Sequence, residues 1–187
     1  VAAWIGRAAA SRMIIGKYAT GLSLVACLIV SRGQLQHWQS GDTMFRHALE
    51  VTEDNHIACY NLARLHLRRS EYPQAVELLR QADKILPNTP DILLNLGTAL
   101  HEGQISMPEA RATYLAAVAA APESPLAYNN LGNLSSGMGR HEEAVGYYEK
   151  ALELDPEYFD TLYNYAGTLL ELRRFTDAAA AYDRALK

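Results

Sequence analysis

An asparagine recurs at a nearly constant interval along most of this chain, at Asn61, Asn95, Asn130 and Asn164. The intervals are 34, 35 and 34 residues. A fixed period of this length is typical of a solenoid in which each repeat contributes a pair of helices. Because one such repeat cannot bury its apolar face alone, the chain must fold by stacking its repeats on one another.

The residues that follow each asparagine also repeat, by size rather than by identity. A bulky residue and a small residue come next, and an alanine, a large residue and a second alanine come later. In the third repeat these positions hold Leu131, Gly132, Ala144, Tyr148 and Ala151. Small residues let two helices approach closely, and large residues fill the space beside them. The pattern predicts two amphipathic helices per repeat, packed antiparallel.

The period divides the chain into units. We expect an all-α solenoid over residues 56–187, made of the units 56–89, 90–124 and 125–158 and a partial fourth unit, 159–187. The second unit is one residue longer, and we expect the extra residue in its inter-helix turn, because a turn absorbs an insertion without breaking the period. Each complete unit closes with a proline, which cannot continue a helix; these are Pro87, Pro122 and Pro156.

Two segments of the third unit, 127–133 and 147–156, resemble the consensus of the tetratricopeptide repeat (TPR) family. The resemblance extends over about 56–187. It implies a right-handed superhelix whose concave groove is lined by the first helix of each unit. In that family the groove usually docks a peptide or another protein, and no particular ligand is implied.

The groove is therefore the expected binding site. The four repeating asparagines occupy corresponding faces of successive first helices, and an amide offers two donors and two acceptor lone pairs. A row of amides could hold an extended peptide backbone, as the asparagine ladder of the similar O-GlcNAc transferase family does; alternatively, each amide bonds the neighbouring helix. The main candidates are Asn61, Arg64, Asn95, Thr98, Asn130, Asn133, Asn164 and Thr168, and Tyr60, Arg68, His101 and Asn129 are also expected to face the groove.

No motif in the sequence points to catalysis. The six histidines show no HxxxH or HExxH spacing, and there is no CxxC, P-loop or GxGxxG. We therefore expect no catalytic residue, no cofactor, no metal and no small-molecule substrate in this chain.

Charge is distributed unevenly. Residues 1–32 carry four bases and no acid, whereas the remainder holds 13 bases and 21 acids. Nucleic-acid binding requires a basic face, which an acidic solenoid does not offer. The expected partner is a protein or a peptide.

The N-terminal region differs in character from the repeats. Residues 18–30 are apolar or small, and Arg7, Arg12 and Lys17 precede or border them. We expect a membrane-spanning helix at 13–31 within a region 1–35, with the repeats on the non-cytoplasmic side, in a periplasm or lumen. Two alternatives are a cleaved lipoprotein-type signal at Cys27 and a buried helix of a soluble protein.

The junction, residues 36–55, reads as a degenerate half repeat. Phe45 and Ala48 match the late aromatic residue and alanine of a second helix, although Gly41 replaces the usual alanine. The segment 34–55 resembles the join between the last membrane helix and the repeats in transmembrane-and-TPR O-mannosyltransferase-like proteins of the C-type glycosyltransferase superfamily. That resemblance places the catalytic acids in membrane-domain loops, which have no counterpart among these residues.

Three functional hypotheses follow from the sequence. The first is a membrane-tethered interaction scaffold that binds a protein or extended peptide in its groove. The second is the tail of a multi-spanning glycosyltransferase that presents an acceptor polypeptide to the enzyme. The third is a soluble TPR adaptor.

Overall fold

The computed structural model describes residues 31–32 and 40–186. The expected membrane helix at 13–31 lies outside the described residues except for Ser31. Within the described ranges, no helix is long and apolar enough to cross a membrane. The chain divides into two compact units, 1–47 and 48–187, and the description below concerns the second.

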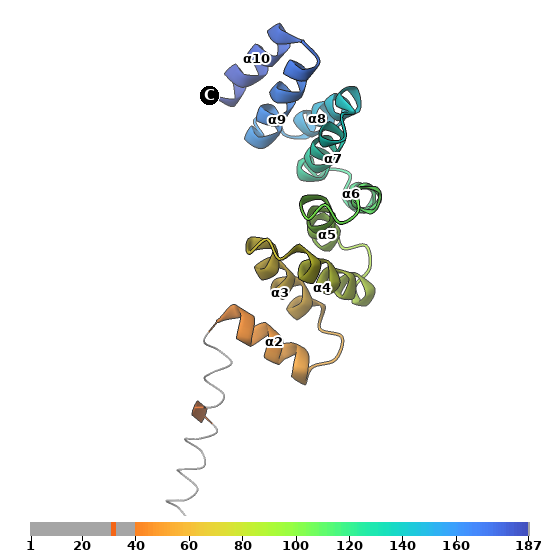
Figure 1. The fold of residues 1–187 in the computed structure, drawn as a ribbon, viewed down its shortest axis with the longest axis vertical. Coiled ribbons are helices and arrows are strands. Elements are labelled where there is room, and N and C mark those ends of the chain that lie inside the picture. Colours follow the sequence, from red (N-terminus) through yellow and green to blue (C-terminus); the bar gives the residue numbers. More distant parts are fainter. Residues whose placement is uncertain (1–30, 33–39, 187) are drawn as a thin grey trace, which may run out of the picture. The chain divides into compact units, whose positions relative to one another are not determined.

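The elements described from residue 40 to residue 186 are all helices (Figure 1). The helix α2 begins in one compact unit and ends in the other. From α3 onward, the helices alternate between the first and the second helix of successive pairs. Their bounds are α2 Gly41–Val51, α3 His56–Arg68, α4 Tyr72–Ile85, α5 Pro90–Glu102, α6 Met107–Ala120, α7 Pro125–Gly137, α8 His141–Leu154, α9 Phe159–Glu171 and α10 Phe175–Ala185.

Local chemistry explains where several of these helices begin. The side chains of Asn55, Ser106 and Ser124 accept hydrogen bonds from backbone N–H groups in the first turns of α3, α6 and α7. These bonds satisfy donors that have no partner inside a helix. Prolines occupy the first turns of α4, α5, α6 and α7, where a missing N–H costs nothing.

The turn inside each pair places one residue in the left-handed region. The φ angles are 57° at Ser70, 50° at Gln104, 74° at Gly139 and 58° at Arg173. The intervals between these residues are again 34, 35 and 34, so the turn repeats with the helices. The extra residue of the second pair lies in this turn, since four residues separate α5 from α6 and three separate α7 from α8.

Two of the repeating glycines are required by packing. Gly97 faces the ring of Tyr114, and a Cβ at Gly97 would lie 2.5 Å from the Tyr114 ring atom Cδ1. Gly132 faces Tyr148, and a Cβ there would overlap that ring as well. Both tyrosines are 1% exposed, so a ring that moved away would lose its own packing contacts. A large ring on the second helix is therefore accommodated by the absence of a side chain on the first.

The first pair solves the same problem with different residues. The two equivalent positions hold Ala63 and Leu79, and both side chains are fully buried. A smaller apolar residue on the second helix thus accompanies a larger one on the first, which keeps the packed volume similar.

Each first helix packs most extensively on the second helix of its own pair. It also contacts the next first helix, through α3–α5, α5–α7 and α7–α9. The predicted all-α solenoid of helix pairs is therefore confirmed for the described residues.

Candidate peptide-binding groove

The candidate site is the face that the first helices α3, α5, α7 and α9 share; we call it the first-helix face. Because consecutive first helices contact one another, residues at the same repeat position form rows across this face. The main candidates predicted from the sequence occupy two of these rows, with the exception of Thr168.

Two of the four asparagines hold neighbouring first helices together. The amide nitrogen of Asn95 donates to the Tyr60 hydroxyl at 3.2 Å, and that of Asn164 donates to Asn129 Oδ1 at 3.4 Å. In both cases the acceptor lies 35 residues earlier. For these two amide nitrogens, the structure shows the inter-helix bond that the sequence left open as an alternative.

The asparagine side chains retain unused capacity. The amide nitrogens of Asn61 and Asn95 also donate to the backbone oxygens four residues earlier, at 2.8 and 2.7 Å. The side chain of Asn130 makes no hydrogen bond with any described residue, and the amide oxygens of Asn61, Asn95 and Asn164 accept none from the described part of the chain. The row therefore presents mainly acceptor oxygens, together with one complete amide.

Buried tyrosines position two further candidates from below. The Tyr148 hydroxyl donates to Asn133 Oδ1 at 2.8 Å, and the Tyr114 hydroxyl donates to Thr98 Oγ1 at 3.3 Å. Both phenols are protonated donors at neutral pH, and burial raises their pKa further, to about 12. The bond to Tyr148 orients the Asn133 amide so that its nitrogen remains available as a donor.

Thr168 does not share the row of the other candidates. Arg64, Thr98 and Asn133 follow the repeat intervals, and the next member of that row is Gly167. Thr168 is 3% exposed, and its hydroxyl lies 3.1 Å from the hydroxyl of Ser136 on α7. Its observed contact therefore joins α9 to α7.

Arg64 carries a charge at the α3 end of the face. Its guanidinium lies over the Tyr60 ring, 5.7 Å from the ring centroid, and it forms no ion pair with a described residue. A cation stacked on a ring and left without a counter-ion can attract an anion.

The first-helix face is hollowed between α7 and α9; we call this cavity the α7–α9 hollow. It has a volume of about 450 Å³, within the range of sites that bind small groups. Three predicted candidates line it, namely Asn133, Asn164 and Thr168. The other lining residues are not among the candidates predicted from the sequence; they are Ser136, Gly137, His141, Tyr148, Tyr163, Gly167 and Glu171.

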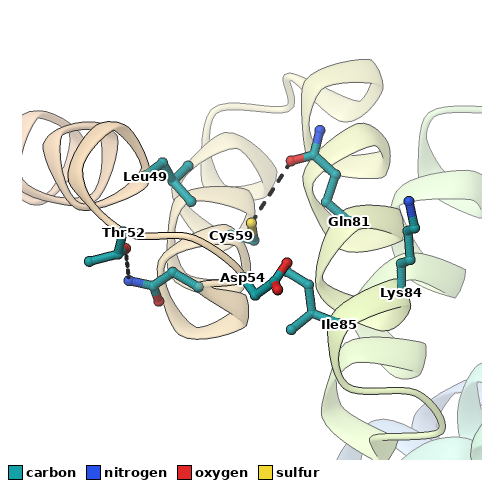
Figure 2. A pocket seen from close by; sticks show the side chains of 8 residues that line it. Leu49, Thr52, Asp54, Cys59, Gln81, Lys84 and Ile85 are labelled. Carbon is teal, nitrogen blue, oxygen red and sulfur yellow. Dashed lines mark hydrogen bonds between the residues drawn. The ribbon is translucent and has the colours of Figure 1, made fainter.

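A second cavity of about 510 Å³ lies beside the end of α2, α3 and α4 (Figure 2). It exists where Cys59 replaces the large residues that later pairs carry at this position. The Cys59 thiol lies 3.9 Å from Gln81 Oε1, and burial raises its pKa, so it remains an unreactive thiol. In the described part of the chain, no group of three or more His, Cys, Asp or Glu residues could hold a metal ion.

The stacked helix pairs and the polar first-helix face define a helical-repeat protein of the kind that binds other polypeptides. Models of the tetratricopeptide repeat match residues 30–91, 60–125, 125–158 and 147–180. The chain belongs to the tetratricopeptide repeat family.

Two curated relatives are much longer than this chain. It is 30% identical over 122 residues to Protein O-mannosyl-transferase TMTC3 of Homo sapiens, which covers 65% of this chain and 13% of that protein. It is 28% identical over 120 residues to the Peroxisomal targeting signal receptor of Eremothecium gossypii, which covers 64% of this chain and 20% of that protein. The chain thus spans a fifth or less of each relative's length.

Solved structures share the fold. PilF of Pseudomonas aeruginosa superposes with a TM-score of 0.70 at 27% identity, over 86% of this chain and 74% of that one. The first TPR domain of Spaghetti, solved with an HSP90 peptide, superposes with a TM-score of 0.60 at 20% identity, over 67% and 98% of the two chains.

Proposed function

We propose that this chain is a protein-interaction module whose first-helix face binds an extended segment of a partner protein. The observation that carries the proposal is the row of amide oxygens that accept no hydrogen bond from a described residue, together with the Asn130 side chain, which bonds none of the described residues. An extended backbone exposes unpaired N–H and C=O groups at regular intervals. Amide groups repeated along the face can bond these groups whatever the peptide's side chains are.

Relatives support this choice of ligand. One is a receptor for a targeting signal, and the Spaghetti domain was solved with a peptide bound. A peptide is therefore a ligand that this architecture accommodates elsewhere.

A peptide selected by phage display against the purified chain would test the proposal. Asn130→Ala should weaken its binding about three- to tenfold, the loss of one hydrogen bond or slightly more. The unfolding midpoint should not fall, because the Asn130 side chain bonds none of the described residues and alanine is the better helix former at this position in α7. Gln74→Ala, at an exposed position on α4, is the matched control and should leave affinity unchanged. Equal affinity for the wild type and Asn130→Ala would remove the amide row from the binding site.

We also propose that residues 13–31 attach the module to a membrane, with the repeats on the non-cytoplasmic side. The support is the apolar run with its basic flank. In membranes from cells that express the chain, alkaline carbonate should leave it in the pellet. A glycosylation acceptor appended after Lys187 should be modified in a eukaryotic host. Release by carbonate would contradict attachment, and an unmodified acceptor would contradict the orientation.

A second candidate function follows from the similarity to Protein O-mannosyl-transferase TMTC3. In this alternative the repeats present an acceptor polypeptide to a membrane-embedded glycosyltransferase. Sequencing the coding region upstream of Val1 would separate the two. Several more apolar segments with an acidic loop after the first would favour the alternative, and a start codon within a few residues would favour the single-anchor scaffold.

A further inference from the structure

We propose that the α7–α9 hollow is a specificity pocket for a basic side chain, Lys or Arg, of the bound segment. This inference rests on the function proposed above, since it assumes that a peptide lies on the first-helix face. It adds what that function leaves open, namely which side chain the groove selects.

The first argument concerns why the hollow exists. Gly167 lies inside α9, where glycine is less favourable than alanine. A Cβ there would meet only the Tyr182 hydroxyl, at 3.8 Å, which is an ordinary contact, whereas a Cβ at Gly132 would overlap a buried ring. Packing therefore does not require glycine at 167. The other three units fill this position with Arg64, Thr98 and Asn133.

The second argument concerns charge. Glu171 lines the hollow, and its carboxylate forms no ion pair with any residue of the described ranges. No Lys or Arg lines the cavity. The Asn164 amide oxygen, also without a bond from a described donor, adds a second acceptor. An ammonium or guanidinium group supplies the donors and the positive charge that these two groups lack.

The third argument concerns the wall of the hollow. Tyr163 is 57% exposed, an unusual exposure for an aromatic side chain. Its ring stacks on Phe159 at a centroid distance of 6.4 Å and meets Tyr182 edge-on at 5.6 Å. These contacts hold the ring in place while leaving much of its surface accessible. The face of a tyrosine ring attracts cations, so the wall and Glu171 favour the same ligand.

The opposite end of the first-helix face has the opposite charge. Arg64 has no ion-pair partner among the described residues and lies on α3, in the first pair of the solenoid. An acidic side chain of the bound segment is therefore attracted to α3, and the hollow at α9 is left to a basic one.

The test uses three capped pentapeptides, acetyl-Ser-Ala-Xaa-Ala-Ser-amide, in which Xaa is lysine, norleucine or glutamate. Each is titrated into the ¹⁵N-labelled full chain, and ¹H–¹⁵N spectra are recorded. The lysine peptide should shift the signals of Asn133, Asn164 and Gly167 with a dissociation constant about fivefold lower than the other two. That ratio corresponds to one exposed cation–π contact and one surface ion pair.

Variants of the pocket sharpen the test. Glu171→Gln should abolish most of the preference for lysine, and Gly167→Leu should fill the hollow and prevent the shifts. Glu102→Gln is the matched control, because Glu102 holds the same repeat position on α5 and the substitution changes the net charge equally. It should retain the lysine preference. Circular dichroism melts confirm that each variant is folded.

The outcomes separate the two proposals. Equal shifts with lysine and glutamate, or a lysine preference that survives in Glu171→Gln, would overturn the basic-side-chain pocket. The pocket proposal would also be overturned if the pentapeptides caused no chemical-shift changes while a selected peptide bound in an Asn130-dependent way. That result would leave the proposed groove function standing. If no peptide perturbs any residue of α3, α5, α7 or α9, both proposals are wrong.

Discussion

Adding one methyl group at Gly132 should destabilise the chain, whereas adding the same group at Gly146 should stabilise it. Both glycines belong to the α7–α8 pair and lie within helices. A Cβ at Gly132 would overlap the Tyr148 ring, whereas a Cβ at Gly146 would have no neighbour within 4 Å. The two substitutions share the helix-propensity gain and differ in the steric term.

The magnitudes follow from this difference. Replacing glycine by alanine in a helix interior gains about 0.5–1 kcal/mol, which is the whole effect expected for Gly146→Ala. Overpacking a buried site costs about 1–3 kcal/mol. The free energies of unfolding of the two variants should therefore differ by about 1–3 kcal/mol, with Gly132→Ala the less stable. The Tyr148 ring is 1% exposed, so moving away from the added methyl group would cost it its own packing contacts.

Urea unfolding followed by far-ultraviolet and tyrosine near-ultraviolet circular dichroism measures both variants. The double variant Gly132→Ala/Tyr148→Leu recreates the Ala63 and Leu79 arrangement of the first pair. It should be more stable than the sum of its single changes implies, by about 0.5–3 kcal/mol. If Gly132→Ala stabilises as much as Gly146→Ala, the explanation of the glycine by the tyrosine ring is refuted.

Three further predictions concern other parts of the solenoid. Burial raises the pKa values of Tyr114 and Tyr148 from 10.0 to about 12. The free energy of unfolding should therefore be fully retained below pH 10 and should fall by about 2–3 kcal/mol for each phenol between pH 10 and 12, because the phenols ionise there in the unfolded state first. A urea midpoint that does not change over this interval would contradict it. Arg173→Gly should stabilise the chain by about 0.5–1 kcal/mol, because φ is 58° at this turn residue; a lower melting temperature would show that the Arg173 side chain contributes in another way. In a Cys27→Ser background at pH 8, Cys59 should react with a disulfide reagent at least about tenfold more slowly in the folded chain than in urea, because its thiol is 2% exposed and its pKa is raised. Equal rates in the two conditions would show that the Cys59 site opens freely.

The amide row illustrates how far a repeating residue predicts its role. The interval alone places Asn61, Asn95, Asn130 and Asn164 at equivalent positions, and the structure gives them different partners. Asn95 bonds Tyr60 because the preceding first helix, α3, carries a hydroxyl at the facing position. Among the described residues, Asn130 has no such bond. The role of each asparagine depends on what the neighbouring unit places opposite it.

Much of the architecture is determined by the sequence alone. The period, the alternation of small and large residues and the prolines specify helix pairs, because a pair that buries its apolar face only against its neighbours must repeat the same contacts. The packing of Gly132 against Tyr148 can be predicted from the sequence for the same reason, because a residue's size at a repeat position constrains the size of the residue that faces it.

The tertiary structure alone decides which side chains of the first-helix face line a cavity and which have free hydrogen-bonding groups. Thr168 is a groove candidate from the sequence; the structure shows it 3% exposed, beside Ser136 and lining the α7–α9 hollow, while Gly167 occupies the row of Asn133. The α7–α9 hollow depends on that glycine together with Glu171 and the exposed ring of Tyr163, a combination that no other unit repeats. Periodicity specifies the backbone positions that recur, whereas cavities and free hydrogen-bonding groups arise where neighbouring side chains fail to match, and that depends on the three-dimensional offset between particular helices.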